Sequence, residues 1–119
     1  MELTITGIGD KGNLANERIG LKAIKDCELK FYQLFRTEFF DAGGFSNRSK
    51  SSYWFAPKKV KAGDKIIIYT KHGTDNFEIK EDGSTIHWYY WGLDQPIFIN
   101  DKHGVVLVEI NNWQMSKDK

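Results

Sequence analysis

Cysteine and long apolar runs are almost missing from this 119-residue sequence. The single cysteine, Cys27, excludes an internal disulfide and is compatible with a reducing compartment such as the cytoplasm. No apolar run approaches the roughly 20 residues of a membrane helix, so we expect no membrane insertion. The opening M-E-L-T-I-T-G also lacks the basic and apolar regions of a signal peptide. The formal net charge is +1, which singles out no class of partner, and the cellular location stays open.

The spacings that bring catalytic groups or metal ligands together are missing as well. The three histidines, His72, His87 and His103, form no H-x-x-x-H pair, and there is no C-x-x-C. Neither a phosphate-binding G-x-x-x-x-G-K-[ST] nor a G-x-S-x-G elbow is present. We therefore expect a non-enzymatic protein with no catalytic residue, no metal site and no cofactor.

Helical periodicity is the third absence, because no 11-residue window shows a convincing apolar stripe. The chain instead consists of short apolar or alternating runs separated by clusters of Gly, Asn, Asp and Ser, at the spacing typical of an all-β sandwich or barrel. Its length fits one domain. The runs expected to form strands are 3–8, 17–23, 29–35, 53–55, 66–69, 77–80, 86–91, 97–99 and 105–110.

The stretch 53–70 organises this pattern, and we read it as two strands joined by a basic turn. Pro57 closes an aromatic run, since proline has no N–H for a central ladder, and Gly63 supplies turn chemistry. The run 66–69 is apolar on both faces and so suits a central strand. The residues expected in the core are Ile5, Leu21, Leu34, Ile66, Ile68, Leu107 and one aromatic pair from 86–91.

Several short motifs together resemble a lamin tail domain. They are E-L-x-I at 2–5, N-E-R-I-G-L-K at 16–22, L-x-x-Y-x-L at 29–34, V-K-A-G-D-K-I-I-I-Y at 60–69 and G-V-V-L-V at 104–108. The resemblance implies an immunoglobulin-like β-sandwich of about 7–9 strands that acts as an interaction module for protein or DNA. The segment 36–52 is long for such a domain, and 86–91 is unusually aromatic. We expect one sandwich over residues 1–113 and a solvated tail over 114–119.

A basic stretch at 48–65 is the first candidate binding surface. It holds six cations and one acid, with three aromatic residues inside it. Cations with interleaved aromatics are typical of single-stranded nucleic-acid grooves. Lysines that solvate a turn, with the aromatics in the core, would produce the same pattern. The lysines singled out for binding are Lys58, Lys59 and Lys61.

The aromatic strand I-H-W-Y-Y-W at 86–91 is the second candidate. Strand alternation places His87, Tyr89 and Trp91 on one face and Trp88 and Tyr90 on the other. Only one face of a sandwich sheet meets the core, so the other is exposed unless a loop such as 36–52 covers it. We expect His87, Tyr89 and Trp91 to form an exposed surface that contacts a protein partner or a second copy. A nucleic-acid-binding β-domain that uses 48–65 and a carbohydrate-binding module are the alternatives.

Overall fold

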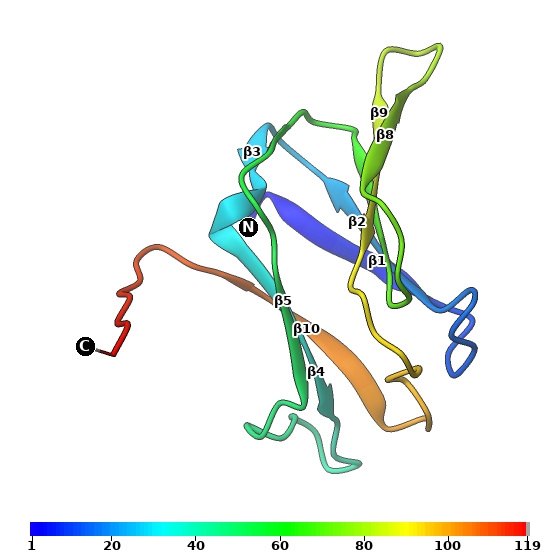
Figure 1. The fold of residues 1–119 in the computed structure, drawn as a ribbon, viewed down its shortest axis with the longest axis vertical. Helices are drawn as coiled ribbons and strands as arrows, with labels where there is room; N and C mark the ends of the chain where they lie inside the picture. Colours follow the sequence, from blue (N-terminus) through cyan, green and yellow to red (C-terminus); the bar gives the residue numbers. More distant parts are fainter. Residues whose placement is uncertain (119) are drawn as a thin grey trace.

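The computed structural model describes residues 1–118, which contain ten strands, one turn of 3-10 helix and no α-helix (Figure 1). The all-β prediction is therefore confirmed. No helix within residues 1–118 is long and apolar enough to cross a bilayer. The elements are β1 (Leu3–Gly9), β2 (Arg18–Ala23), β3 (Cys27–Glu28), η1 (Leu29–Phe31), β4 (Tyr32–Glu38), β5 (Ser51–Trp54), β6 (Lys59–Val60), β7 (Lys65–Tyr69), β8 (Asn76–Ile79), β9 (Thr85–Tyr90) and β10 (His103–Glu109). Two of the ten strands, β3 and β6, are two-residue segments that the sequence pattern did not indicate.

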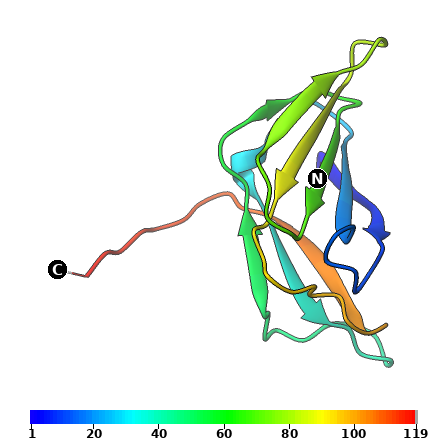
Figure 2. The ribbon, with the colours of Figure 1, turned by 45° about the vertical axis from the view of Figure 1, so that its right-hand side comes forward.

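The strands form a five-stranded sheet in the order β1-β2-β7-β9-β8 and a three-stranded sheet in the order β10-β4-β5. A short β3-β6 pair completes the set. β7 lies in the centre of the larger sheet, antiparallel to β2 and parallel to β9, so the central-strand prediction is confirmed. The β8–β9 hairpin projects from the body of the domain (Figure 2). The C-terminal segment also leads away from the body, although its Trp113 packs against Trp54 of β5.

The expected hairpin within 53–70 is wrong. β5 pairs with β4 in the smaller sheet, whereas β7 pairs with β2 and β9 in the larger one. Phe55 follows β5 and is buried, and Pro57 follows two residues later, so the chain leaves its first sheet at this point. The segment between the two strands carries the chain from one sheet to the other and pairs with β3 on the way through β6.

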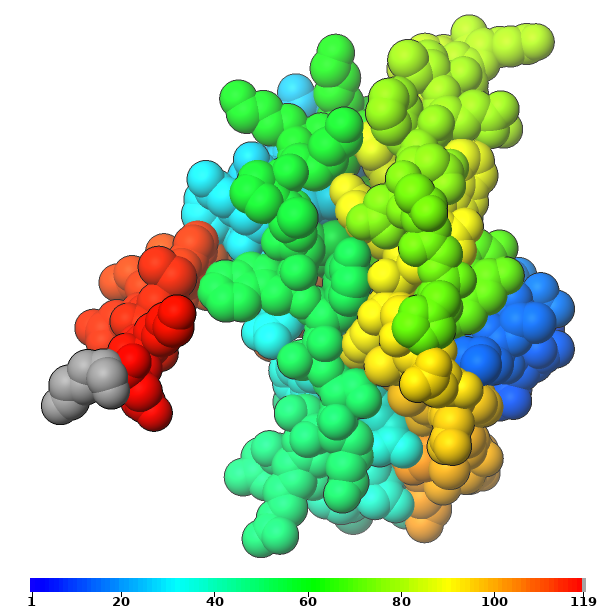
Figure 3. Space-filling model, in the orientation of Figure 1, coloured from blue at the N-terminus to red at the C-terminus, as the bar shows by residue number. Residues whose placement is uncertain are grey.

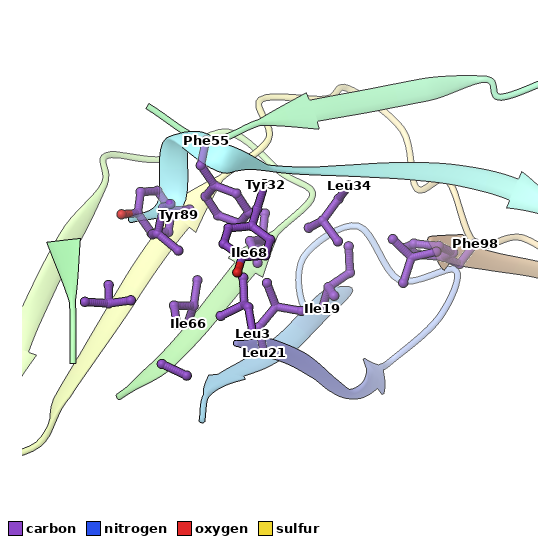
Figure 4. Packing of buried hydrophobic residues seen from close by; sticks show 14 residues of the cluster. Leu3, Ile19, Leu21, Tyr32, Leu34, Phe55, Ile66, Ile68, Tyr89 and Phe98 are labelled. Atoms are coloured by element: carbon purple, nitrogen blue, oxygen red, sulfur yellow. The ribbon is translucent and has the colours of Figure 1, made fainter. Parts of the chain in front are cut away.

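One apolar cluster fills the space between the two sheets (Figure 4). The alternation of β2 sends Ile19, Leu21 and Ala23 into it, as expected. Two other core predictions need correction. Ile5 is 36% exposed, because it lies on the edge strand β1 next to a register shift, and Leu107 is only partly buried. The buried apolar residues are Leu3, Ile19, Leu21, Ala23, Leu29, Tyr32, Leu34, Phe55, Val60, Ile66, Ile68, Tyr89, Phe98 and Val105.

The segment 97–99, expected to be a strand, is an irregular loop that is held by a buried carboxylate. Glu17 is fully buried, and its two oxygens accept hydrogen bonds from the backbone N–H groups of Gly12, Ile97 and Phe98 and from the Thr70 hydroxyl, at 2.8–3.1 Å. A buried carboxylate needs such partners to offset its lost hydration. Glu17 thereby joins the 10–16 loop, the end of β7 and the 92–102 loop.

The smaller sheet holds the same loop from the other side. The Arg36 side chain donates through Nε to the Ile97 carbonyl at 2.8 Å, and its Nη2 lies 3.1 Å from Nε2 of His103. The Ile99 N–H donates to Nδ1 of His103 at 3.2 Å. Burial and the Arg36 guanidinium, with a smaller effect from Lys11, lower the pKa of His103, and Glu38 acts in the opposite sense.

This arrangement predicts a loss of stability in mild acid. The neutral form of His103 is favoured in the folded state, so the unfolded chain takes up a proton first, as the pH falls below about 6.5. We expect the free energy of unfolding, measured by urea denaturation, to fall between pH 7.5 and pH 5.5. The fall should be smaller in His103→Gln. Equal falls in both proteins would contradict this assignment.

Candidate functional site: a groove beside an open strand edge

The expected exposed face of the aromatic strand points into the protein. His87 and Tyr89 are 4% and 8% exposed, and Trp91 is partly buried against the core, so the prediction that these three form an exposed surface is wrong. The reason is register, because His87 and Tyr89 stand beside the fully buried Ile66 and Ile68 of β7. The side chains that point outward are Trp88 and Tyr90, and both are half-buried.

Aromatic residues from the end of the smaller sheet cover this inner face. Tyr53 lies 6.4 Å from Tyr89 and 5.7 Å from Trp91 between ring centres, and Phe55 meets Tyr89 edge-on at 5.3 Å. The 36–52 segment has another packing role, since its Phe45 contacts Phe35 and Phe39. Burial, together with the charges of Asp75 and Glu28, raises the pKa of Tyr89 to about 12, so its hydroxyl stays protonated at neutral pH.

The basic stretch 48–65 is not one continuous surface. Of its three aromatic residues, Phe55 is buried and Tyr53 is partly buried, while Trp54 is 44% exposed. The Trp54 indole donates to the Lys30 carbonyl at 2.7 Å and meets Trp113 edge-on at 5.1 Å, away from the lysines that follow Pro57. The aromatics of this stretch therefore mainly build the fold. Lys58, Lys59 and Lys61 are all exposed.

A groove runs between the segment 56–61 and the projecting β8–β9 hairpin. It consists of two adjoining hollows of about 220 and 260 Å³ that share Lys58, Phe77 and His87 as lining residues. In Figure 3 the yellow-green hairpin and the green segment before β6 form its two sides. Five of the six side chains predicted for binding line it, and only Trp91 does not. The five are His87, Tyr89, Lys58, Lys59 and Lys61.

Two residues that sequence reasoning missed dominate the hairpin side of the groove. Phe77 and Ile79 of β8 are 56% and 68% exposed, and they alternate along the strand on the side that faces the lysines. The Lys58 ammonium lies 4.8 Å from the centre of the Phe77 ring, in the position of a cation–π contact. The F-x-I alternation in a segment expected to be an edge strand was the signal that could have identified them.

The edge of β8 that points away from β9 is open. Within residues 1–118, β8 forms a ladder with β9 alone. An edge strand presents unpaired N–H and C=O groups, and natural proteins usually protect a long apolar edge with charges or a covering segment. In this protein β8 is not fully covered, since all four of its side chains are exposed. The edge is thus open to pairing with another strand.

A buried contact between Asp64 and His87 fixes the floor of the groove against the basic turn. Asp64 accepts hydrogen bonds from the Lys61 and Thr85 N–H groups, each at 3.0 Å, and lies 3.1 Å from Nε2 of His87. Burial opposes ionisation of Asp64, but these hydrogen bonds outweigh it and lower the pKa of the carboxyl. The Asp64 and His87 side chains are each 6% exposed, and this contact holds the turn and β9 at a fixed separation.

The groove also has an uneven distribution of charge. Lys58, Lys59 and Lys61 stand on one side, whereas Asp75 lies at one end of the groove and Glu78 of β8 is not among the lining residues. Among residues 1–118, no three His, Cys, Asp or Glu side chains are grouped so that they could hold a metal ion. The arrangement is therefore suited to recognising an extended, partly acidic chain.

No protein-family model and no curated protein matches this sequence. The resemblance to lamin tail domains accordingly stays a prediction. Two residues of its motifs have structural roles here, namely Glu17 of N-E-R and Asp64 of G-D-K, whose carboxylates are both buried and hydrogen-bonded.

Proposed function

We propose that this protein is a non-enzymatic binding module of lamin-tail-like type that holds an extended segment of a protein partner along β8. One observation carries the proposal, namely that Phe77 and Ile79 are exposed on an edge strand, in a groove that three lysines also line. This keeps the interaction role expected from the sequence but moves it from the face of Trp91 to the edge of β8.

The chemistry of the edge indicates what such a segment looks like. A strand added to an open edge gains main-chain hydrogen bonds, and pockets for its alternate side chains give specificity. Apolar side chains of the segment would pack on Phe77 and Ile79. Acidic side chains would meet Lys58, Lys59 and Lys61, whose ammonium groups add rate and selectivity more than affinity. The proposed ligand is therefore an extended segment that combines apolar and acidic residues.

Single-stranded nucleic acid is the second candidate, because the same lysines stand beside an exposed phenylalanine. Stacking on aromatic rings supplies much of the affinity in such complexes. In this protein Phe55 is buried and Tyr53 is partly buried, which leaves few rings within reach of the lysines. The peptide is consequently favoured.

A defined probe tests the proposal. A fluorescent eight-residue peptide of alternating valine and glutamate is expected to bind the protein, as measured by fluorescence anisotropy at physiological salt. Phe77→Ala together with Ile79→Ala should weaken binding at least tenfold, equivalent to about 1.4 kcal/mol. The matched control combines Phe40→Ala with Ile24→Ala, at positions outside the groove where the side chains are 52% and 54% exposed. It should change the affinity less than twofold.

A second set of variants separates peptide from nucleic acid. Lys58, Lys59 and Lys61 are replaced by glutamate, and Lys25, Lys30 and Lys50 are replaced in the control. The protein is a nucleic-acid binder if twelve-residue oligothymidylate binds more tightly than the peptide and its affinity depends steeply on salt. That binding should then be lost in the first triple variant and kept in the control. Unchanged peptide binding in the Phe77 and Ile79 variant would also reject the proposal.

A further inference from the structure

A hollow of about 450 Å³ lies on the outer face of the five-stranded sheet, over β1, β2 and β7. It is separate from the groove, because its floor includes Ile67, whose neighbours Ile66 and Ile68 point the other way into the core. The volume falls in the range of small-ligand sites, roughly 300–1,000 Å³. It is too small for a protein interface.

The rim of the hollow is positive. Lys22 and Lys65 stand directly opposite each other on β2 and β7, and both are exposed. Like charges in this arrangement repel each other, and within residues 1–118 neither lysine has a carboxylate at ion-pair distance. Arg18 lies on the same face of β2, four residues from Lys22, and pairs with Asp10 at 2.6 Å. A bound anion would relieve the repulsion between the two lysines.

The floor of the hollow is flat and largely apolar. Gly20 lies between Arg18 and Lys22 along β2 and directly opposite Ile67 of β7, so β2 itself places no side chain between these two cations. The Thr6 hydroxyl borders this floor, only 2.6 Å from where a Cβ on residue 20 would lie, which is why glycine is needed there. An apolar floor, one hydroxyl and a cationic rim favour a ring-shaped ligand with an acidic group.

We propose that this hollow binds an acidic sugar, such as a unit of a uronic-acid polysaccharide. The carboxylate lies between Lys22 and Lys65, the C–H face of the ring packs on Gly20 and Ile67, and the ring hydroxyls reach Thr6. The next acidic unit of the chain can reach Arg18, roughly 13 Å along β2 from Lys22. The lysine ammonium groups thus match the carboxylate of such a sugar, and the apolar floor matches its C–H face.

Nucleic acid fits this face less well, because two of its aromatic rings are already occupied. Tyr69 and Tyr90 stack on each other at 5.7 Å with an interplanar angle of 14°, and the Lys71 ammonium lies over Tyr69. Bases would have to displace these contacts in order to stack. Sugar rings need only the apolar floor, so this face favours the saccharide.

The test is an NMR titration of the ¹⁵N-labelled protein with trigalacturonate up to 10 mM. We expect saturable shifts of the amide signals of Gly7, Gly20 and Ile67, while the signals of Phe77 and Ile79 stay in place. Neutral cellotriose, inorganic sulfate and six-residue oligothymidylate are the comparison ligands. Equal or larger effects from sulfate or from the oligonucleotide, or no shifts with trigalacturonate, would overturn the proposal.

A stable variant distinguishes binding from folding. Lys65→Glu places opposite charges across β2 and β7, so its melting temperature should equal or exceed that of the parent protein. Its affinity for trigalacturonate should nevertheless fall at least tenfold. Lys25→Glu, which changes the net charge equally at another exposed position, should bind within twofold of the parent. Retained binding in Lys65→Glu would refute the site.

Discussion

Replacing Glu17 with alanine is expected to lower the free energy of unfolding by at least about 4 kcal/mol. The change leaves three backbone N–H groups and the Thr70 hydroxyl without their acceptor in a buried site. Each unsatisfied buried donor costs about 1–3 kcal/mol. Since domains of this kind are stable by only about 5–15 kcal/mol, urea denaturation should show a large shift of the midpoint.

Two further variants keep this prediction testable if the alanine variant does not fold. Glu17→Gln retains the shape of the side chain but turns an acceptor into a donor at one end, so it should still lose about 2 kcal/mol or more. Glu81→Ala, at an exposed position of the β8–β9 turn, should stay within about 0.5 kcal/mol of the parent protein. A loss below about 1 kcal/mol in Glu17→Gln would mean that the carboxylate does not hold these loops together.

Replacing Phe98 with alanine is expected to cost about 3–5 kcal/mol, the usual range for a buried phenylalanine. Phe98 is 1% exposed, although it belongs to a loop without regular structure. Its ring belongs to the shared core cluster, so truncation leaves a cavity there. The neighbouring Ile99 is 65% exposed, and Ile99→Ala provides the matched control, with an expected change within about 0.5 kcal/mol. Similar losses in the two variants would show that the loop does not anchor through Phe98.

The parts of the fold that could be predicted from sequence are those that local alternation determines. Ile19, Leu21 and Ala23 share a buried face because a strand places every second side chain on one side. The apolar run of β7 indicated a central strand for a similar reason. In both cases the pattern of a few neighbouring residues carries the information.

Alternation says which residues share a face, but it does not say which face is buried. In β9 both faces carry aromatics, so His87 and Tyr89 could be assigned to either side. The buried side is determined by the pairing of β9 with β7. These two strands are separated in the sequence by β8, so their pairing is not a local feature. The same limit explains why Lys58 and Phe77 were treated as parts of different patches, although they meet in one groove.

The 92–102 loop escaped prediction for a different reason. Its apolar residues, Ile97 to Ile99, read as a short strand, yet the backbone hydrogen bonds of this segment go to side chains of Glu17 and His103 rather than to a ladder. Such bonds join residues that are distant in sequence, and no periodicity reveals them.

The pairing of β10 with β4 has a consequence for synthesis of the chain. His103 pairs with Glu38 and Glu109 with Tyr32, so β4 lacks this partner until roughly 70 further residues have left the ribosome. Such non-local pairing slows folding, because distant segments must meet before their contacts stabilise anything. During that interval the nascent β4 is open to pairing with the wrong strand, so synthesis of β10 sets the moment at which β4 is protected from aggregation.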